Sequence, residues 1–249
     1  MADETEQQNP FKSRGFIVAA AVVAVLVIVG AVVIINALGK PKDPAISSTQ
    51  TPQPSASAAP TAPTADAGGV SVCGLNTVKM SGTLNAAPEA QWAYLDTITF
   101  PTSKVSGPGN SDTSKTMNCF ERTPQGSVFA AAAGMAQLSS PKHNVGWIKA
   151  NVVDGPVKNQ MLESAQSDST TNDGQSRTTF SGFKLLSYDG DTARVDLGVT
   201  GTGKGKTIYM SMIVPLVWED GDWKMDFTES DMRSPAQLPN LAGYALWKE

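Results

Sequence analysis

Few residues in this chain could carry out chemistry, and they lie far apart in the sequence. His143 is the only histidine; a histidine-based metal site, which needs a second one, is not expected, and neither is a catalytic triad. Its context, Pro-Lys-His-Asn, predicts an exposed loop between helices. Asp96 and Asp226 fall in predicted strands and are the candidates for a general base inside a pocket. Asp226 alternates with apolar residues, so we expect it to face solvent.

Two acidic groups could in principle bind calcium: Asp189 and Asp191, and Glu219, Asp220 and Asp222. Each group stands next to a glycine between two predicted strands, where Asp and Gly favour turn geometry. We therefore predict turns at both places. The run at 201–206 (GTGKGK) resembles a phosphate loop only in its glycines. It lacks the spacing of that motif and precedes a strand rather than a helix.

Taken together, these residues predict a protein that is not an enzyme, with no catalytic residue, no metal and no cofactor. No set of side chains can share the roles of nucleophile, base and oxyanion donor. The net charge is −4, and no block of Lys and Arg is interleaved with aromatic residues. Because neutralising phosphates supplies most of the affinity for nucleic acid, direct nucleic-acid binding is not expected.

The chain has two cysteines, Cys73 and Cys119, and they do not form a CxxC pattern. In an oxidising compartment such a pair is most simply a disulfide. The disulfide would join the N-terminal segment of the folded domain to its body. Two buried free thiols are the alternative.

Residues 15–38 carry no charge, and Asn36 is their only strongly polar side chain. A helix of this length reaches about 36 Å, enough to cross a hydrocarbon core of about 30 Å. A cleaved signal peptide usually has a shorter apolar run, so we predict an uncleaved transmembrane helix. Ala20, Ala24 and Ala31 share one face of it, which leaves a homo-oligomer possible through close helix packing.

The orientation of this helix does not follow from charge, because Lys12 and Arg14 precede it while Lys40 and Lys42 follow it. All of the sequence able to fold lies after the helix. We therefore predict a single-pass protein of the cell membrane with a cytoplasmic tail at 1–14 and an extracytoplasmic C-terminal domain.

Residues 39–69 are rich in Pro, Ser, Thr and Ala. They hold too few apolar groups to offset the entropy of ordering, so we predict a disordered or extended linker. It would be a stalk that carries the domain away from the membrane, or a linker with no spacing role. The domain then spans 70–230, followed by a tail at 231–249.

The domain reads as helices followed by an antiparallel meander. The predicted helices and strands are a strand at 91–100, a helix from Thr123-Pro124 to Leu138, helices near 145–150 and 156–165, and strands at 180–188, 194–199, 207–218 and 223–227, the last two joined at Asp220-Gly221. Such an order predicts an α+β domain.

This order, closing on the hairpin WEDGDWK at 218–224, resembles the nuclear transport factor 2-like fold, in which a curved sheet wraps around helices. A short cytoplasmic tail, one membrane helix and such a domain outside resemble the VirB/TcpC-type assembly proteins of conjugative type IV secretion. The linker and the helix start also resemble actinobacterial membrane proteins found with mobile elements. The resemblance implies a place in an envelope complex.

The tail contains Leu241, Tyr244 and Trp247 without a strand period. It either packs back on the domain or docks a partner, and these three residues are the candidate partner-binding anchors. We therefore predict a membrane-anchored extracytoplasmic interaction or scaffold protein whose partners are other envelope proteins of a conjugation or secretion complex. The alternative is an envelope receptor or sensor that holds a small apolar ligand in the cone of the domain.

Overall fold

The computed structural model describes residues 69–110, 116–167, 176–228 and 235–248. The predicted cytoplasmic tail, transmembrane helix and nearly all of the linker lie outside these residues. Within them, no helix is both long and apolar enough to span a bilayer.

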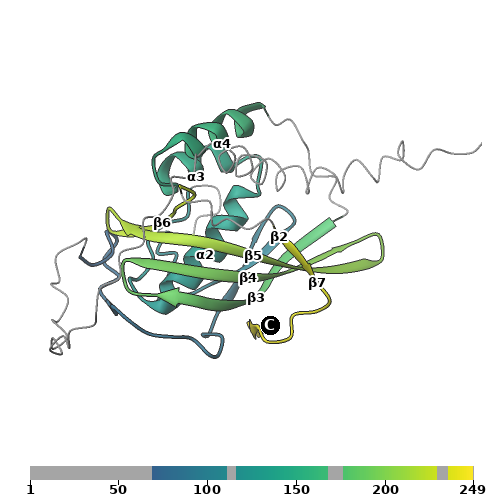
Figure 1. Ribbon diagram of the computed structural model, residues 1–249, viewed down its shortest axis with the longest axis horizontal. Coiled ribbons are helices and arrows are strands. Elements are labelled where there is room, and N and C mark those ends of the chain that lie inside the picture. Colours follow the sequence, from purple (N-terminus) through teal and green to yellow (C-terminus); the bar gives the residue numbers. More distant parts are fainter. Residues whose placement is uncertain (1–68, 111–115, 168–175, 229–234, 249) are drawn as a thin grey trace, which may run out of the picture.

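One eight-stranded sheet forms most of the domain, and its first six strands are neighbours in chain order. The strands are β1 (Gln91–Leu95), β2 (Ile98–Thr102), β3 (Ser176–Tyr188), β4 (Thr192–Gly203), β5 (Lys206–Glu219), β6 (Asp222–Met225), β7 (Ala236–Leu238) and β8 (Ala245–Leu246). All pairings are antiparallel except that of β2 with β3. The sheet curls into a half-barrel (Figure 1).

Three helices are described: α2 (Pro124–Leu138), α3 (Asn144–Asn151) and α4 (Pro156–Ser167). Helix α2 begins as predicted, because the Thr123 hydroxyl accepts the Gly126 N–H at 3.0 Å and a proline takes the first helical position. It lies inside the curve of the sheet, while α3 and α4 stand over one end (Figure 1). The α+β prediction is confirmed.

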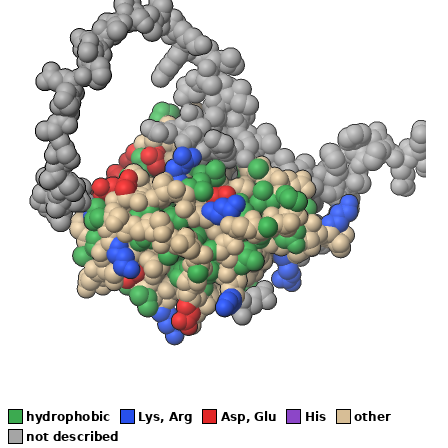
Figure 2. Space-filling model, turned by 60° about the horizontal axis from the view of Figure 1, so that its bottom comes forward, with side chains coloured by type: hydrophobic (Ala, Val, Ile, Leu, Met, Phe, Trp, Pro, Cys, Tyr) green, Lys and Arg blue, Asp and Glu red, His purple; other side chains and the backbone are tan. Residues whose placement is uncertain are grey.

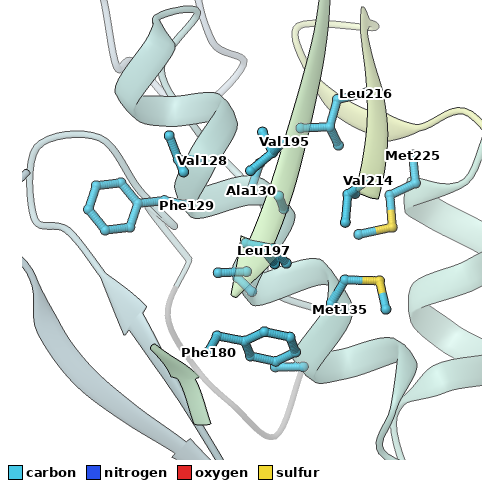
Figure 3. Close-up of a cluster of buried hydrophobic side chains, with 14 of the residues drawn as sticks. Val128, Phe129, Ala130, Met135, Phe180, Val195, Leu197, Val214, Leu216 and Met225 are labelled. Carbon is cyan, nitrogen blue, oxygen red and sulfur yellow. The ribbon is translucent and has the colours of Figure 1, made fainter. Parts of the chain in front are cut away.

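The core lies between α2 and the face of the sheet that curves around it, the inner face. Val128, Phe129 and Met135 of α2 belong there to one buried cluster with Val195 and Leu197 of β4 (Figure 3). Because α2 is almost entirely small or apolar, it is buried on every side, as a helix without a polar face must be.

The predicted strand at 91–100 is wrong in one respect: it is a hairpin. β1 and β2 are joined by a two-residue turn, with Leu95 opposite Ile98. Asp96 opens this turn with φ 53°, a conformation that Asp tolerates better than most residues. Its carboxylate therefore does not sit within a strand, as the general-base hypothesis required. The apolar run on both sides of Asp96 concealed the turn.

Candidate interaction site on the C-terminal strap

Residues 236–247 form a strap across the outer face of the sheet, the face opposite α2. The strap begins as β7, which pairs with β5 at Tyr209–Ser211, and ends as β8, which pairs with β3 at Gly182–Phe183. These two pairings lie on opposite edges of the three-stranded unit β3–β4–β5. The strap therefore ties the long strands together (Figure 1).

Two glycines make room for the strap. Gly182 of β3 and Gly198 of β4 lie opposite each other and point to the outer face, because their neighbours Phe183 and Leu197 point into the core. A Cβ on Gly198 would come within 2.8 Å of the Tyr244 ring and 3.0 Å of the Leu241 side chain. The strap can lie flat on β3 and β4 only because positions 182 and 198 are glycines, which have no side chain.

We expect Gly198→Ala to destabilise the protein by about 1–3 kcal/mol, because the added methyl pushes the strap off the sheet. The matched control is Gly146→Ala, where the nearest atom to the new Cβ is 3.9 Å away. That change in helix α3 should be neutral or stabilising by about 0.5–1 kcal/mol. Urea unfolding of the two variants measures both values. Equal effects would contradict the role assigned to Gly198.

A partly buried polar cluster fastens the middle of the strap. The Tyr244 hydroxyl donates to Asp196 Oδ2 at 2.7 Å, and the Ser211 hydroxyl donates to Asp196 Oδ1 at 2.6 Å. Burial raises the pKa of Tyr244 to about 12, so its hydroxyl keeps the proton that it donates. The Lys184 ammonium lies 4.0 Å from the centre of the Tyr244 ring on its other side, a cation–π contact.

Trp247 is not an exposed anchor, and the prediction for this residue is corrected. Its side chain is 5% exposed and packs in the core between Phe183 and Phe129, at ring-centre distances of 4.9 and 6.1 Å. The backbone N–H of Trp247 also donates to the Ser181 carbonyl. The pairing of β8 with β3 turns residue 247 inward, because successive side chains of a strand point to opposite faces.

The other two predicted anchors do lie on the surface. Leu241 and Tyr244 are half-buried on the outer face, over Gly198. Sequence reasoning missed Leu246, which is 51% exposed and contacts Gly182 on the same face. Leu246 can be assigned to the face opposite Trp247 only once β8 is known to be a strand, in which successive side chains alternate between faces. Leu241, Tyr244 and Leu246 together form what we call the strap surface.

The disulfide prediction is confirmed, since Cys73 and Cys119 are joined with their Cα atoms 5.6 Å apart. Asp222, predicted as a turn residue, is instead buried and supports this joint. Its carboxylate accepts the backbone N–H groups of Cys119 at 2.6 Å and Phe120 at 3.0 Å, and also that of Trp223. Burial raises the pKa of Asp222, although these hydrogen bonds act in the opposite direction.

His143 lies between helices as predicted, although it is half-buried rather than exposed. Its Nδ1 is 2.9 Å from the Ser140 hydroxyl, which also lies 2.7 Å from Asp96 Oδ2. In a catalytic triad the histidine stands between the serine and the carboxylate. Here the serine is in the middle and fully buried, so the group links the β1–β2 turn to the loop after α2.

The other acidic residues singled out above accept hydrogen bonds from neighbouring residues and stabilise local chain geometry. Burial alone would raise the pKa of Asp189, but hydrogen bonds from Thr192 and from the Asp191 N–H outweigh it and lower that pKa. Asp226 follows β6, where its carboxylate accepts the Thr228 N–H at 2.9 Å. Within the described segments, no three His, Cys, Asp or Glu side chains are close enough together to hold a metal ion.

The domain is thus an α+β unit whose half-barrel sheet and three described helices fit a nuclear transport factor 2-like fold. Residues 52–246 match the family described as "Domain of unknown function (DUF8175)". Since this match covers most of the chain, the protein belongs to that family. Comparison with curated proteins and with solved structures found no match. The family match includes the strap as far as Leu246.

Proposed function

We propose that this protein is a membrane-anchored extracytoplasmic scaffold that binds other envelope proteins through the strap surface. The observation that carries the proposal is the exposure of Leu246 beside the half-exposed Leu241 and Tyr244, on a segment that pairs with β5 at one end and with β3 at the other. Interfaces depend on a few large apolar or aromatic anchors. When such anchors are already held in place, less entropy is lost on binding.

Two further features support an interaction role. Disulfides persist mainly in oxidising compartments outside the cytoplasm, so the Cys73–Cys119 bond supports an extracytoplasmic location for the domain. The inner face of the sheet is occupied by α2 and by the buried aromatic residues Phe129, Phe180 and Phe183, which favours a scaffold over a receptor for a small apolar ligand. The resemblance to conjugation assembly proteins makes a secretion or conjugation complex the setting that we propose.

A photo-crosslinking amino acid placed at Leu246 of the full chain tests this proposal in the native membrane. We expect crosslinks to defined envelope proteins from position 246 and fewer from Val105, which is 67% exposed but lies in a loop on another part of the domain. Leu246→Glu should then abolish binding of the purified partner. Because surface substitutions usually change stability by less than about 0.5 kcal/mol, it should not lower the melting temperature.

If Leu246→Glu left partner binding unchanged, that result would contradict the proposal. A small apolar molecule that copurifies with the chain, in the absence of protein crosslinks, would instead support the receptor alternative.

A further inference from the structure

The sheet carries three exposed cations at its β4–β5 turn, which we call the basic tip: Lys204 and Lys206 of the hairpin and Arg177 of the neighbouring strand β3. The turn itself is Lys204-Gly205, with φ values of 50° and 72°, which is typical of a tight two-residue hairpin. Strand pairing places Lys206 opposite Gly203, and Arg177 of β3 opposite Thr202. The hairpin projects past the body of the domain, at the right in Figure 1.

The cations of the basic tip have no ion pair within the described residues, whereas Lys142 and Lys158 each have one and Lys224 has two. In Figure 2 the charged side chains at the right-hand end, where the tip lies, are Lys and Arg, while the main group of Asp and Glu in view lies toward the other end. The chain as a whole has a net charge of −4. The tip is therefore a local positive end on an acidic protein.

An exposed apolar side chain lies close to the turn, on the same face of the hairpin as Lys206. Ile208 pairs with Gly201, the third pair from the turn, and it is 44% exposed. Gly201, Gly203 and Gly205 add no side-chain bulk around it. A narrow end that combines cations with an exposed aliphatic group suits the boundary between water and acyl chains, where charge and apolar burial both contribute. A polyanion in water would make no use of the exposed Ile208.

We propose that the basic tip docks on a bilayer surface through the anionic headgroups of its lipids. This inference rests on the proposed membrane anchoring, which would keep the domain near a bilayer. Each Lys or Arg close to an anionic membrane strengthens binding about fivefold, so three give on the order of 100-fold. Such affinity is weak for a free protein but sufficient for a tethered one, because a tether supplies a high effective concentration.

The entry point of the tether is compatible with this docking. Arg122 contacts the carbonyls of both Gly190 and Gly69, so the described chain begins at the end of β4 that is remote from the tip. The 11 steps from Thr192 to Gly203 separate the two ends by about 36 Å. The 30 residues from 40 to 69 could span about 30 Å as a coil and about 90 Å when extended. The tip can therefore turn back to the membrane that holds the anchor.

The test places the full chain in nanodiscs of phosphatidylcholine alone or of phosphatidylcholine mixed with phosphatidylglycerol. An environment-sensitive dye on Thr202→Cys, exposed at the tip, reports contact with lipid. We expect a blue shift of the dye emission only with the anionic lipid, and its loss at high salt. Lys204→Gln with Lys206→Gln should weaken docking about 25-fold. Lys104→Gln with Lys149→Gln, also exposed and of equal charge change, should have no effect.

Anchoring and docking fail in different ways. If the chain coelutes with both nanodiscs and the dye responds equally in each, docking on anionic lipid is wrong, and a wall polymer or an acidic protein becomes the candidate ligand. If the chain coelutes with neither, the anchoring is wrong. Flotation of the same chain with vesicles of the two compositions then tests whether the basic tip binds anionic lipid. The inference is overturned if binding is the same with and without the anionic lipid, or the same with and without the tip substitutions.

Discussion

Trp247→Ala should lower the free energy of unfolding by about 3–5 kcal/mol, the usual cost of removing a buried large aromatic side chain. The indole fills the space between Phe129 and Phe183, and it is 5% exposed. In a domain of this size the change corresponds to a fall in melting temperature on the order of 10 °C. Calorimetry of the oxidised full chain measures it.

Two further variants make this result specific. Leu246→Ala changes the neighbouring strap residue, which is 51% exposed, and it should shift the free energy of unfolding by less than about 0.5 kcal/mol. Trp247→Phe should keep most of the stability, because the indole N–H has no hydrogen-bond partner among the described residues to lose. A Trp247→Ala protein that melts normally but loses its partners would restore Trp247 as a surface anchor.

Loss of the disulfide should have an effect of similar size. The Cys73–Cys119 bond closes a loop with a sequence separation of 46. In the chain-entropy account, this constraint on the unfolded state stabilises the protein by about 4 kcal/mol. Replacing both cysteines by serine should therefore lower the melting temperature on the order of 10 °C. Calorimetry of this double variant measures the change.

Reduction of the wild-type chain should match the double serine variant. The native fold should persist at lower temperature, since Asp222 still accepts the N–H groups of Cys119 and Phe120 without the disulfide. Alkylation of protein taken directly from cells supplies the other check. Free thiols at both positions would contradict the disulfide in its native setting, and with it the extracytoplasmic location that we propose.

Local sequence determined the long elements of this domain. The apolar alternation of Val195, Leu197 and Val199 makes β4 a strand with one apolar face, and the pattern is visible without any partner. Thr123-Pro124 starts α2 because both residues act through neighbouring backbone atoms. The cysteine pair could also be predicted, since two cysteines allow only one intramolecular pairing.

Only the tertiary structure decided the strap and the inward turn of Trp247. A strand of two residues has no period to detect, and β8 exists because the free edge of β3 accepts it. Gly182 and Gly198 look like weak points in their strands until the strap is seen crossing them. Asp222 likewise reads as a turn residue, although two of the N–H groups that its carboxylate accepts, those of Cys119 and Phe120, lie about a hundred positions away. Contacts between such distant segments depend on how the sheet curls around α2, and no local pattern encodes that.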